Sequence, residues 1–515
     1  MNARPLCCLF SCAVIGLLAC ACSTPGTRSP QSKDFEADLA QLKRSDPASP
    51  AALSVQLNYA EFLLSGAQGP CAERLEHAQE QLGSVDANPE ARVMFPEGWA
   101  NVADLEYRVH LARADCSGVD RQNELQAAVV AAQRAVELYR NVFDYHSMVI
   151  MQFDAAVAMH QLGEDPAALK ALETALDMDR EYGFRDDAPE NYKLLLSWRG
   201  EPAGDEEVAA LMRDFPQRKA ALKFGWRAND AQVSVESHRE CLQDGQIVPS
   251  NAAATFERHI GPGENGGWSV SYSSRLSRYE PGVWPAMQGS QAPAMVFAPA
   301  LLPGAGFKVS AIGEFESVTD SASFAAQLAT STEKLIRAAA PAGDRATILT
   351  NEAIDTTTSF FTPGMLEAAA AENYQLETAM WIGATLDQGV WYQVEAPLSV
   401  AGMPRVVVQN RIEFAFTRRV PCTAQATERT CVEIVIRATP DKEALERVMA
   451  DFIGPDDESR IADYASSSQA RIVTDPATLL AYAREQRVYW YASLGRGRTI
   501  LQSEHLVSRT TYATD

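Results

Sequence analysis

Two side chains, Ser331 and Lys334, have the type and spacing that nucleophilic catalysis can use. On a helix they would lie one turn apart, so the amine could activate the hydroxyl. That chemistry also needs a Lys-Thr-Gly-like strand motif, which this sequence does not contain. We therefore interpret the pair as part of a polar helix surface and predict no catalytic residue.

A glycine-rich segment, residues 261–266, matches the GxGxxG pattern of dinucleotide sites. Such a site requires a strand before the glycines and a helix after them. Here residues 268–272 alternate polar and apolar side chains, which is typical of a strand. The segment therefore predicts a loose hairpin turn and no nucleotide cofactor.

Metal-binding patterns are absent from the sequence. None of the seven histidines stands in an HxH or HExxH spacing, and the cysteines form no CxxC pair. His238 and Cys241 make only a lone pair, and the acidic runs at 186–187 and 456–458 lack the glycine-containing loop of a calcium site. We expect no metal and no cofactor.

The beginning of the chain indicates export. Arg4 precedes an apolar run at 9–18, which leads into the sequence Leu17-Leu18-Ala19-Cys20. A basic residue, a short apolar run and a small-residue cleavage site are typical of a secretory signal. An ordinary cleaved signal that happens to contain cysteine is one interpretation.

The same segment resembles the bacterial lipoprotein signal, with Leu17 at −3, Ala19 at −1 and then Cys20. The resemblance implies that the chain is cut after residue 19 and that Cys20 is lipidated. The acyl chains would then anchor the protein in the lipid bilayer. Ala21, rather than Asp, follows Cys20, which by the same resemblance favours the outer membrane, facing the periplasm.

Six cysteines follow Cys20, and export would place them where disulfides persist. We predict the pairs Cys422–Cys431 and Cys71–Cys116. Cys22 would remain in a tether, and Cys241 would be buried and free.

Charge excludes one class of partner. The net charge is −22 and the sequence pI is about 4.8. Such a chain repels polyanions, so we expect no nucleic-acid partner.

Length and pattern predict several segments after the signal at 1–19, since 515 residues exceed a single core. Residues 20–48, rich in Ser, Pro, Thr, Gln and Lys, predict a disordered tether. Residues 49–220 show apolar spacings of three and four, which indicate helices. From 221 to 515 the period becomes two, with helical stretches inserted at 321–340 and 365–382. We therefore expect an α-helical hairpin array, followed by an α+β domain with a large antiparallel sheet.

Residues 152–180 resemble a tetratricopeptide repeat. Ala156 and Met159 occupy the small and bulky positions of a first helix, Gly163 the turn, and Leu172 a place on the second helix. The resemblance implies a surface that binds a partner protein, whose identity the sequence does not reveal. A helical spacer without ligand is the alternative.

Residues 471–480 resemble a turn of periplasmic half-barrel lipoprotein carriers, in which Asp475-Pro476 starts the turn. That family's curved sheet can hold a lipid chain. Any hairpin with Asp-Pro would give the same pattern. If a hydrophobic groove exists, we expect its lining to be Trp268, Tyr272, Trp391, Tyr392, Tyr489, Trp490 and Tyr491. The alternative is that these aromatics only pack the sheet on its helices.

These features favour a membrane-anchored, non-enzymatic binding or assembly factor that acts through its helical repeat domain. A carrier of lipid or another amphiphile in the C-terminal domain is the alternative function. An enzyme with an unrecognised active site is the second alternative.

Overall fold

The computed structural model describes residues 32–45, 50–65, 69–86, 96–216, 218–243, 246–280, 282–283, 295–296, 306–339, 351, 354–355, 358, 361–400, 403–423, 430–441, 443–445, 447, 461–494 and 498–513. The chain divides into two compact units. We call them the helical unit, Met1–Arg218 with Gln388–Trp391 and Gly495–Gly497, and the sheet unit, which holds the rest. Cys20 and the signal lie outside the described residues.

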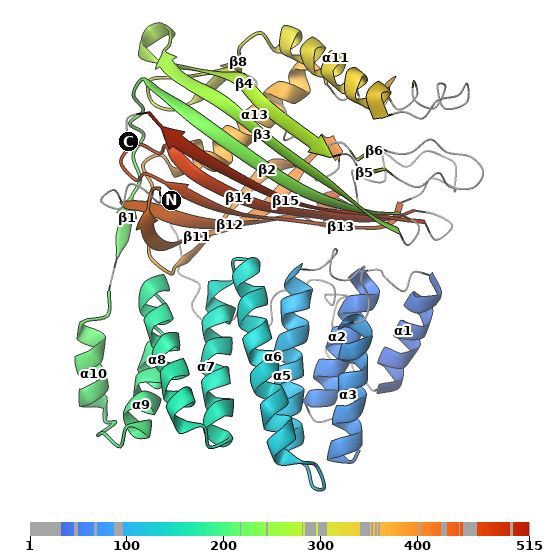
Figure 1. Ribbon diagram of the computed structural model, residues 1–515, viewed down its shortest axis with the longest axis vertical. Coiled ribbons are helices and arrows are strands. Elements are labelled where there is room, and N and C mark those ends of the chain that lie inside the picture. The colour runs from blue at the N-terminus through green and yellow to red at the C-terminus, as the bar shows by residue number, and fades with distance from the viewer. Residues whose placement is uncertain are drawn as a thin grey trace. The chain divides into compact units, whose positions relative to one another are not determined.

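The helical unit is a series of helices joined mostly by short turns (Figure 1). They are α1 (Ser32–Ser45), α2 (Pro50–Leu64), α3 (Cys71–Asp86), α5 (Pro96–Ala114), α6 (Arg121–Asn141), α7 (Tyr145–Gln161), α8 (Asp165–Tyr182), α9 (Ala188–Trp198) and α10 (Asp205–Arg213). Asp120 and Asp144 cap α6 and α7 by accepting hydrogen bonds from backbone N–H groups of the first turn. Buried alanines such as Ala156 and Ala175 let neighbouring helices approach closely.

Helix α1 differs from the expectation of a disordered stretch at 20–48. Phe35, Leu39 and Leu42 recur at spacings of four and three, which places them on one side of a helix. Leu39 is buried, and Phe35 packs against the same core. Phe35 also stacks on Tyr59 of α2, with the ring centroids 5.3 Å apart. The apolar residues of this segment therefore join it to the core of the helical unit, and Tyr59 also donates to Glu36 Oε1 at 3.0 Å.

The sheet unit contains an 11-stranded antiparallel sheet with the order β10-β11-β12-β13-β14-β15-β2-β3-β4-β7-β8. Its strands are β2 (Asn229–Gln243), β3 (Gln246–Pro262), β4 (Trp268–Glu280), β7 (Phe307–Val309), β8 (Phe315–Val318), β10 (Trp391–Val400), β11 (Met403–Pro421), β12 (Thr430–Pro440), β13 (Ile461–Thr474), β14 (Ala481–Leu494) and β15 (Arg498–Tyr512). Short pairs also form between β1 (Lys219–Ala221) and β9 (Thr385–Asp387), and between β5 (Gly282–Val283) and β6 (Met295–Val296). The expected α+β class with a large antiparallel sheet is confirmed.

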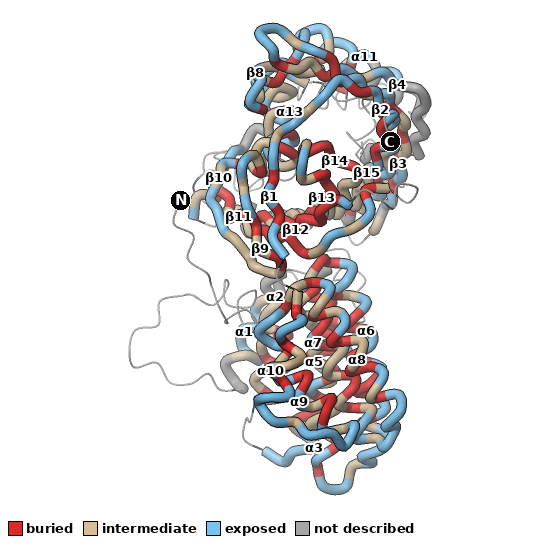
Figure 2. The backbone as a smooth tube through the Cα atoms, turned by 90° about the vertical axis from the view of Figure 1, so that its left-hand side faces the viewer, coloured by how far each residue is buried: buried red, intermediate tan, exposed pale blue. Residues whose placement is uncertain are grey.

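The last strand of the chain, β15, pairs with β2, the first long strand. This pairing joins a meander of C-terminal strands to a meander of earlier strands. The helices α11 (Ser321–Ala339) and α13 (Pro363–Glu377), followed by the short helix η3 (Ala379–Trp381), are inserted between β8 and β9. Figures 1 and 2 show the sheet as a curved layer with these helices along it.

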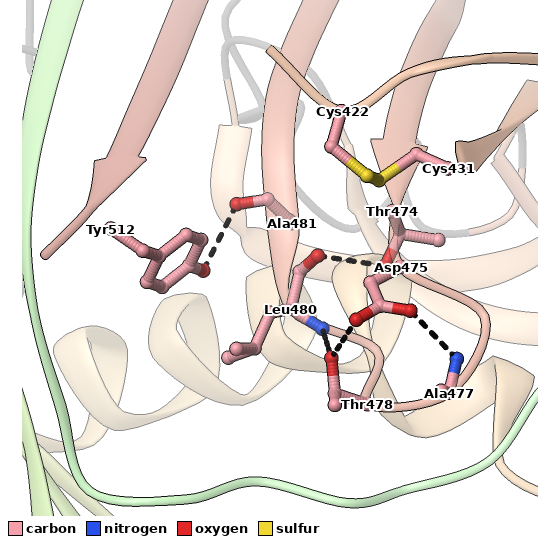
Figure 3. The surroundings of a disulfide bond; sticks show 9 residues. All are labelled: Cys422, Cys431, Thr474, Asp475, Ala477, Thr478, Leu480, Ala481 and Tyr512. Atoms are coloured by element: carbon pink, nitrogen blue, oxygen red, sulfur yellow. Dashed lines mark hydrogen bonds between the residues drawn. A yellow bond between two sulfur atoms is a disulfide. The ribbon is translucent and has the colours of Figure 1, made fainter. Parts of the chain in front are cut away.

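Both predicted disulfides are present. Cys71–Cys116 joins the start of α3 to the turn after α5, and Cys422–Cys431 bridges the ends of β11 and β12 (Figure 3). Cys241 is buried and is not part of either disulfide.

The turn between β13 and β14 begins at Asp475, as predicted from Asp-Pro. The Asp475 carboxylate accepts hydrogen bonds from Ala477 N at 2.9 Å and from Thr478 Oγ1 at 3.0 Å (Figure 3). Leu479 takes a φ of 59°, which L-residues rarely adopt. The carboxylate therefore fixes a turn that the backbone alone would not favour.

Candidate functional site on one face of the sheet

One face of the sheet packs against α13, and we call it the inner face. Arg484 of β14 defines it, because Arg484 Nη1 donates to Glu377 Oε1 of α13 at 2.7 Å. Successive side chains of a strand point to opposite faces, so every second residue shares this face. Residues that pair directly across neighbouring strands also share a face. The inner face therefore includes the row Ile434, Ile472, Arg484, Ser508, Val235 and Ala254.

The inner face is filled with apolar side chains from β11 to β13. Trp381 of η3 is fully buried and meets Phe414 edge-on, with ring centroids 5.0 Å apart. Ile434 and Ile472 are also fully buried. Complete burial of each such aliphatic side chain stabilises the fold by about 1.5–3 kcal/mol. This part of the face is the core of the unit.

Helix α13 is held over the inner face through Tyr374. The Tyr374 hydroxyl donates to the Gly313 carbonyl at 2.9 Å, and its ring lies within 6.1 Å of the rings of Trp226, Phe307 and Phe315. Burial raises the pKa of Tyr374, so the phenol stays neutral. The contacts fix the position of α13 relative to the strands.

Two arginines on the inner face lie beside α13. Arg484 bonds Glu377, and its Nη1 also donates to Asn373 Oδ1 at 3.0 Å. Arg258 of β3 donates to the Tyr512 hydroxyl and lies 5.2 Å from the centroid of that ring. Burial raises the pKa of Tyr512 to about 12, so this partner is neutral. Glu377 is the carboxylate that faces both guanidinium groups.

Farther along β2 and β3 the inner face becomes a narrow apolar stripe. Val233, Ala252, Ala254 and Phe256 form a separate buried cluster, with Val235 packed against it. The two alanines carry only methyl groups, and all four side chains are at most 8% exposed. The stripe is apolar and continuous along two hydrogen-bonded strands.

The stripe ends at a group of polar residues that we call the polar end cluster: Ser237, Arg239, Cys241, Ser250 and Glu504. Four of them are at most 9% exposed, and the Glu504 side chain is 16% exposed. Arg239 Nη2 lies 2.7 Å from Glu504 Oε2, and Ser237 Oγ donates to Glu504 Oε1 at 2.9 Å. Burial raises the pKa of the Cys241 thiol to about 11, so the thiol is protonated at neutral pH.

The opposite face carries a ladder of charges across β12 to β15. Arg471 Nη1 lies 3.1 Å from Glu433 Oε2, and Arg471 Nη2 lies 3.0 Å from Glu485 Oε2. Glu485 Oε1 also pairs with His505 Nε2 at 2.9 Å. The hydrogen bond from His505, opposed by burial and assisted by the charge of Arg471, lowers the pKa of Glu485 to about 2. The opposite face therefore carries this ladder of charges, whereas the inner face combines apolar packing with a few buried charged groups.

Three of the predicted groove residues belong to the packed part of the inner face. Trp268 and Tyr272 of β4 pack against the buried cluster that includes Ile260 and Val270. Tyr392 stacks on Phe414, with centroids 5.6 Å apart. All three therefore belong to the packed interior of the sheet unit.

The remaining aromatics do not converge. Trp490 lies on the inner face, one row beyond Glu504, whereas its neighbours Tyr489 and Tyr491 point to the opposite face. Trp391 begins β10 and falls in the helical unit. The alternation of side chains along a strand thus separates three consecutive aromatics.

The residues that sequence reasoning missed are Arg239, Ser250 and Glu504. The available signal was their position at every second residue of long strands.

Two hollows lie elsewhere. One of 440 Å³ lies between α9 and α10, beside Lys193 and Asp205, and another of 510 Å³ runs along α11, beside Glu333 and Arg337. Arg337 in the second is already bonded to Glu333 and to Asn351. Neither hollow touches the inner face.

The other sequence motifs take ordinary places. The predicted turn at 261–266 is present but shorter, because Gly261 and Pro262 still pair with β4 and the turn contains the short helix η1 (Glu264–Gly266). Ser331 lies in α11, but its side chain is outside the described residues, and Lys334 shares that helix. Within the described ranges, no group of three His, Cys, Asp or Glu side chains could hold a metal ion. Among those same residues, no helix has the length and hydropathy required to cross a bilayer.

Comparison with protein-family models and with curated protein sequences gives no match for this chain. The site is therefore interpreted from its own geometry.

Proposed function

We propose that this protein binds an amphiphile, a molecule with an acyl-like tail and a polar head, on the inner face of its sheet unit. The observation that carries the proposal is the stripe of Val233, Ala252, Ala254 and Phe256, which ends at buried polar groups. Apolar sites with a few placed polar groups are typical of small-molecule binding sites. The sequence resemblance of residues 471–480 to half-barrel carriers supports the same function.

The test compares two adjacent alanines. Ala254 lies on the inner face and is 5% exposed, whereas Ala253 pairs with Glu236 on the opposite face. Native mass spectrometry of detergent-free protein should show a retained or added fatty acid in the parent and in Ala253→Phe. Ala254→Phe, whose ring fills the stripe, should lose it.

Circular dichroism melting controls for folding, because an added ring in a packed region costs about 1–3 kcal/mol. If Ala254→Phe does not fold, Ala252→Val makes the same comparison with a smaller side chain. Equal binding by the inner-face variant and by Ala253→Phe would refute the proposal, as would a parent protein that binds no fatty acid.

Lipid attachment at Cys20 belongs to the same proposal. Its support is the sequence alone, namely the apolar run, Leu17, Ala19 and Cys20. The acyl chains would hold the protein at the outer membrane, and the folded units would face the periplasm.

We also propose that the helical unit docks a protein partner. Two large apolar side chains on neighbouring helices favour it: Val130 of α6 is 58% exposed and Ile150 of α7 is 39% exposed. Cross-linking in intact membranes should capture a discrete partner protein, and the Val130→Asp variant should lose that partner. The control is Gln133→Asp, at an exposed polar position of the same helix, which should keep it. Equal capture by both variants would contradict this role.

A further inference from the structure

The polar end cluster is placed by strand register. Glu504 of β15 lies directly opposite Arg239 of β2, and Arg239 lies directly opposite Ser250 of β3. All three therefore point to the inner face in one row across three strands. The next residue of β3 on that face is Ala252, which belongs to the apolar stripe.

The charges of the cluster balance within the chain. Glu504 uses one oxygen for Arg239 and the other for Ser237. Buried ion pairs are tolerated when their remaining polar atoms are hydrogen-bonded. A ligand at this position therefore does not need to bring a net charge.

Ser250 is different. It is 2% exposed, and its Oγ is buried without a hydrogen-bond partner among the residues that the structure describes. Buried hydroxyls are nearly always bonded, because an unpaired one loses its hydration without compensation. Among the residues that the structure describes, Ser250 Oγ is thus an unused hydrogen-bonding group at the polar end of the stripe.

We propose that Ser250 Oγ donates a hydrogen bond to an acyl oxygen of the amphiphile, the carbonyl of an ester or a carboxylate, beside Arg239. The inference rests on the proposed function and names the chemistry of its ligand. The tail lies along Ala252, Ala254 and Phe256, and the acyl oxygen lies at the end of the stripe.

The experiment titrates the full protein, freed of detergent, with three probes of equal tail length: laurate, methyl laurate and dodecyltrimethylammonium. The third has no oxygen that could accept a hydrogen bond. Native mass spectrometry gives the affinities for the parent, for Ser250→Ala and for Ser234→Ala, an exposed serine on the opposite face of β2.

Ser250→Ala should weaken laurate and methyl laurate binding about five- to tenfold, as expected for one hydrogen bond, and leave dodecyltrimethylammonium unchanged. A loss confined to laurate would identify the ligand as a free acid, and a loss for both would identify the carbonyl oxygen. Ser234→Ala should bind all three probes like the parent.

Unchanged laurate and methyl laurate binding by Ser250→Ala would overturn the inference while leaving the amphiphile site intact. An equal loss for all three probes would also overturn it, because the hydroxyl would then act on the tail or on the fold. A parent that binds none of the three would instead refute the proposed function.

Discussion

Asp179 of α8 is a buried acid in the helical unit. It is fully buried, and Asn191 Nδ2 donates to its Oδ2 at 2.8 Å. Within the described part of the chain, its Oδ1 has no hydrogen-bond partner. Burial, opposed by the hydrogen bond from Asn191, raises the pKa of Asp179 to about 7. The folded protein therefore binds this proton more tightly than the unfolded chain does.

This shift predicts a pH dependence of stability. The contribution of Asp179 is complete below about pH 4, the unfolded pKa, and falls as the pH rises through about 7. Asp179→Asn, which removes the buried charge, should raise the unfolding free energy at pH 8.5 and have little effect at pH 5. Urea unfolding at the two pH values measures it, with Asp186→Asn at an exposed position as the control. A variant that is destabilised equally at both pH values would contradict the buried-charge account.

For Glu485 in the sheet unit, the pH dependence of stability has the opposite sign. Its pKa is lowered from 4.5 to about 2 by the hydrogen bond from His505 and by the charge of Arg471. The stability it contributes is present above about pH 4.5 and is lost as the pH falls toward 2. Glu485→Gln should cost on the order of 1 kcal/mol at pH 7 and nothing at pH 2, as measured by thermal melts. An unchanged melting temperature at pH 7 would show that the ladder is not stabilising.

Residue types alone suggested an aromatic groove. The two-residue period of a strand, however, places neighbouring aromatics on opposite faces of the sheet. Tyr489, Trp490 and Tyr491 are consecutive, so one groove cannot take all three from a regular strand. Ser250 could not be identified in advance because an unpaired hydroxyl is a property of its surroundings. The two cysteine pairs were predicted on the expectation of export, and both are present.

Secondary-structure elements were predicted well wherever the apolar period was strong. The helical stretches predicted at 321–340 and 365–382 occur as α11 and α13. Helix α1 was not predicted, because its three apolar residues are diluted by charged ones. The pairing of β15 with β2 spans most of the sheet unit in sequence, and no local pattern encodes it.

The two disulfides should differ in how much each stabilises the folded protein. Cys71 and Cys116 are 45 residues apart, and Cys422 and Cys431 are 9 apart. A cross-link stabilises mainly by restricting the unfolded chain, by about 4 kcal/mol for the longer loop and about 3 kcal/mol for the shorter one. Calorimetry of the two double Cys→Ser variants should show the larger loss for the Cys71–Cys116 pair. A larger loss for the short loop would mean that local contacts, not loop entropy, dominate.

At the scale of the whole molecule, we propose that one chain carries both a lipid anchor at Cys20 and a ligand-binding sheet. Replacing Cys20 with Ala should move the protein from the membrane fraction to the soluble fraction after carbonate washing, with the anchor chains lost. Ala21→Ser, next to the lipidation position, serves as the control and should stay in the membrane. Retention of the Cys20→Ala protein in the membrane would reject the lipid anchor while leaving the sheet proposal untouched.

The central claim is that an amphiphile occupies the inner face, and a photoactivatable fatty acid tests it most directly. A diazirine near the end of the tail, activated after binding to the full protein, labels the side chains that it touches, and peptide mass spectrometry locates them. The account predicts labels on β2 and β3 at inner-face positions such as Val233, Ala254 and Phe256, competed by unlabelled fatty acid. Labels confined to the opposite face, at positions such as Ala253, or to the helical unit, would contradict it.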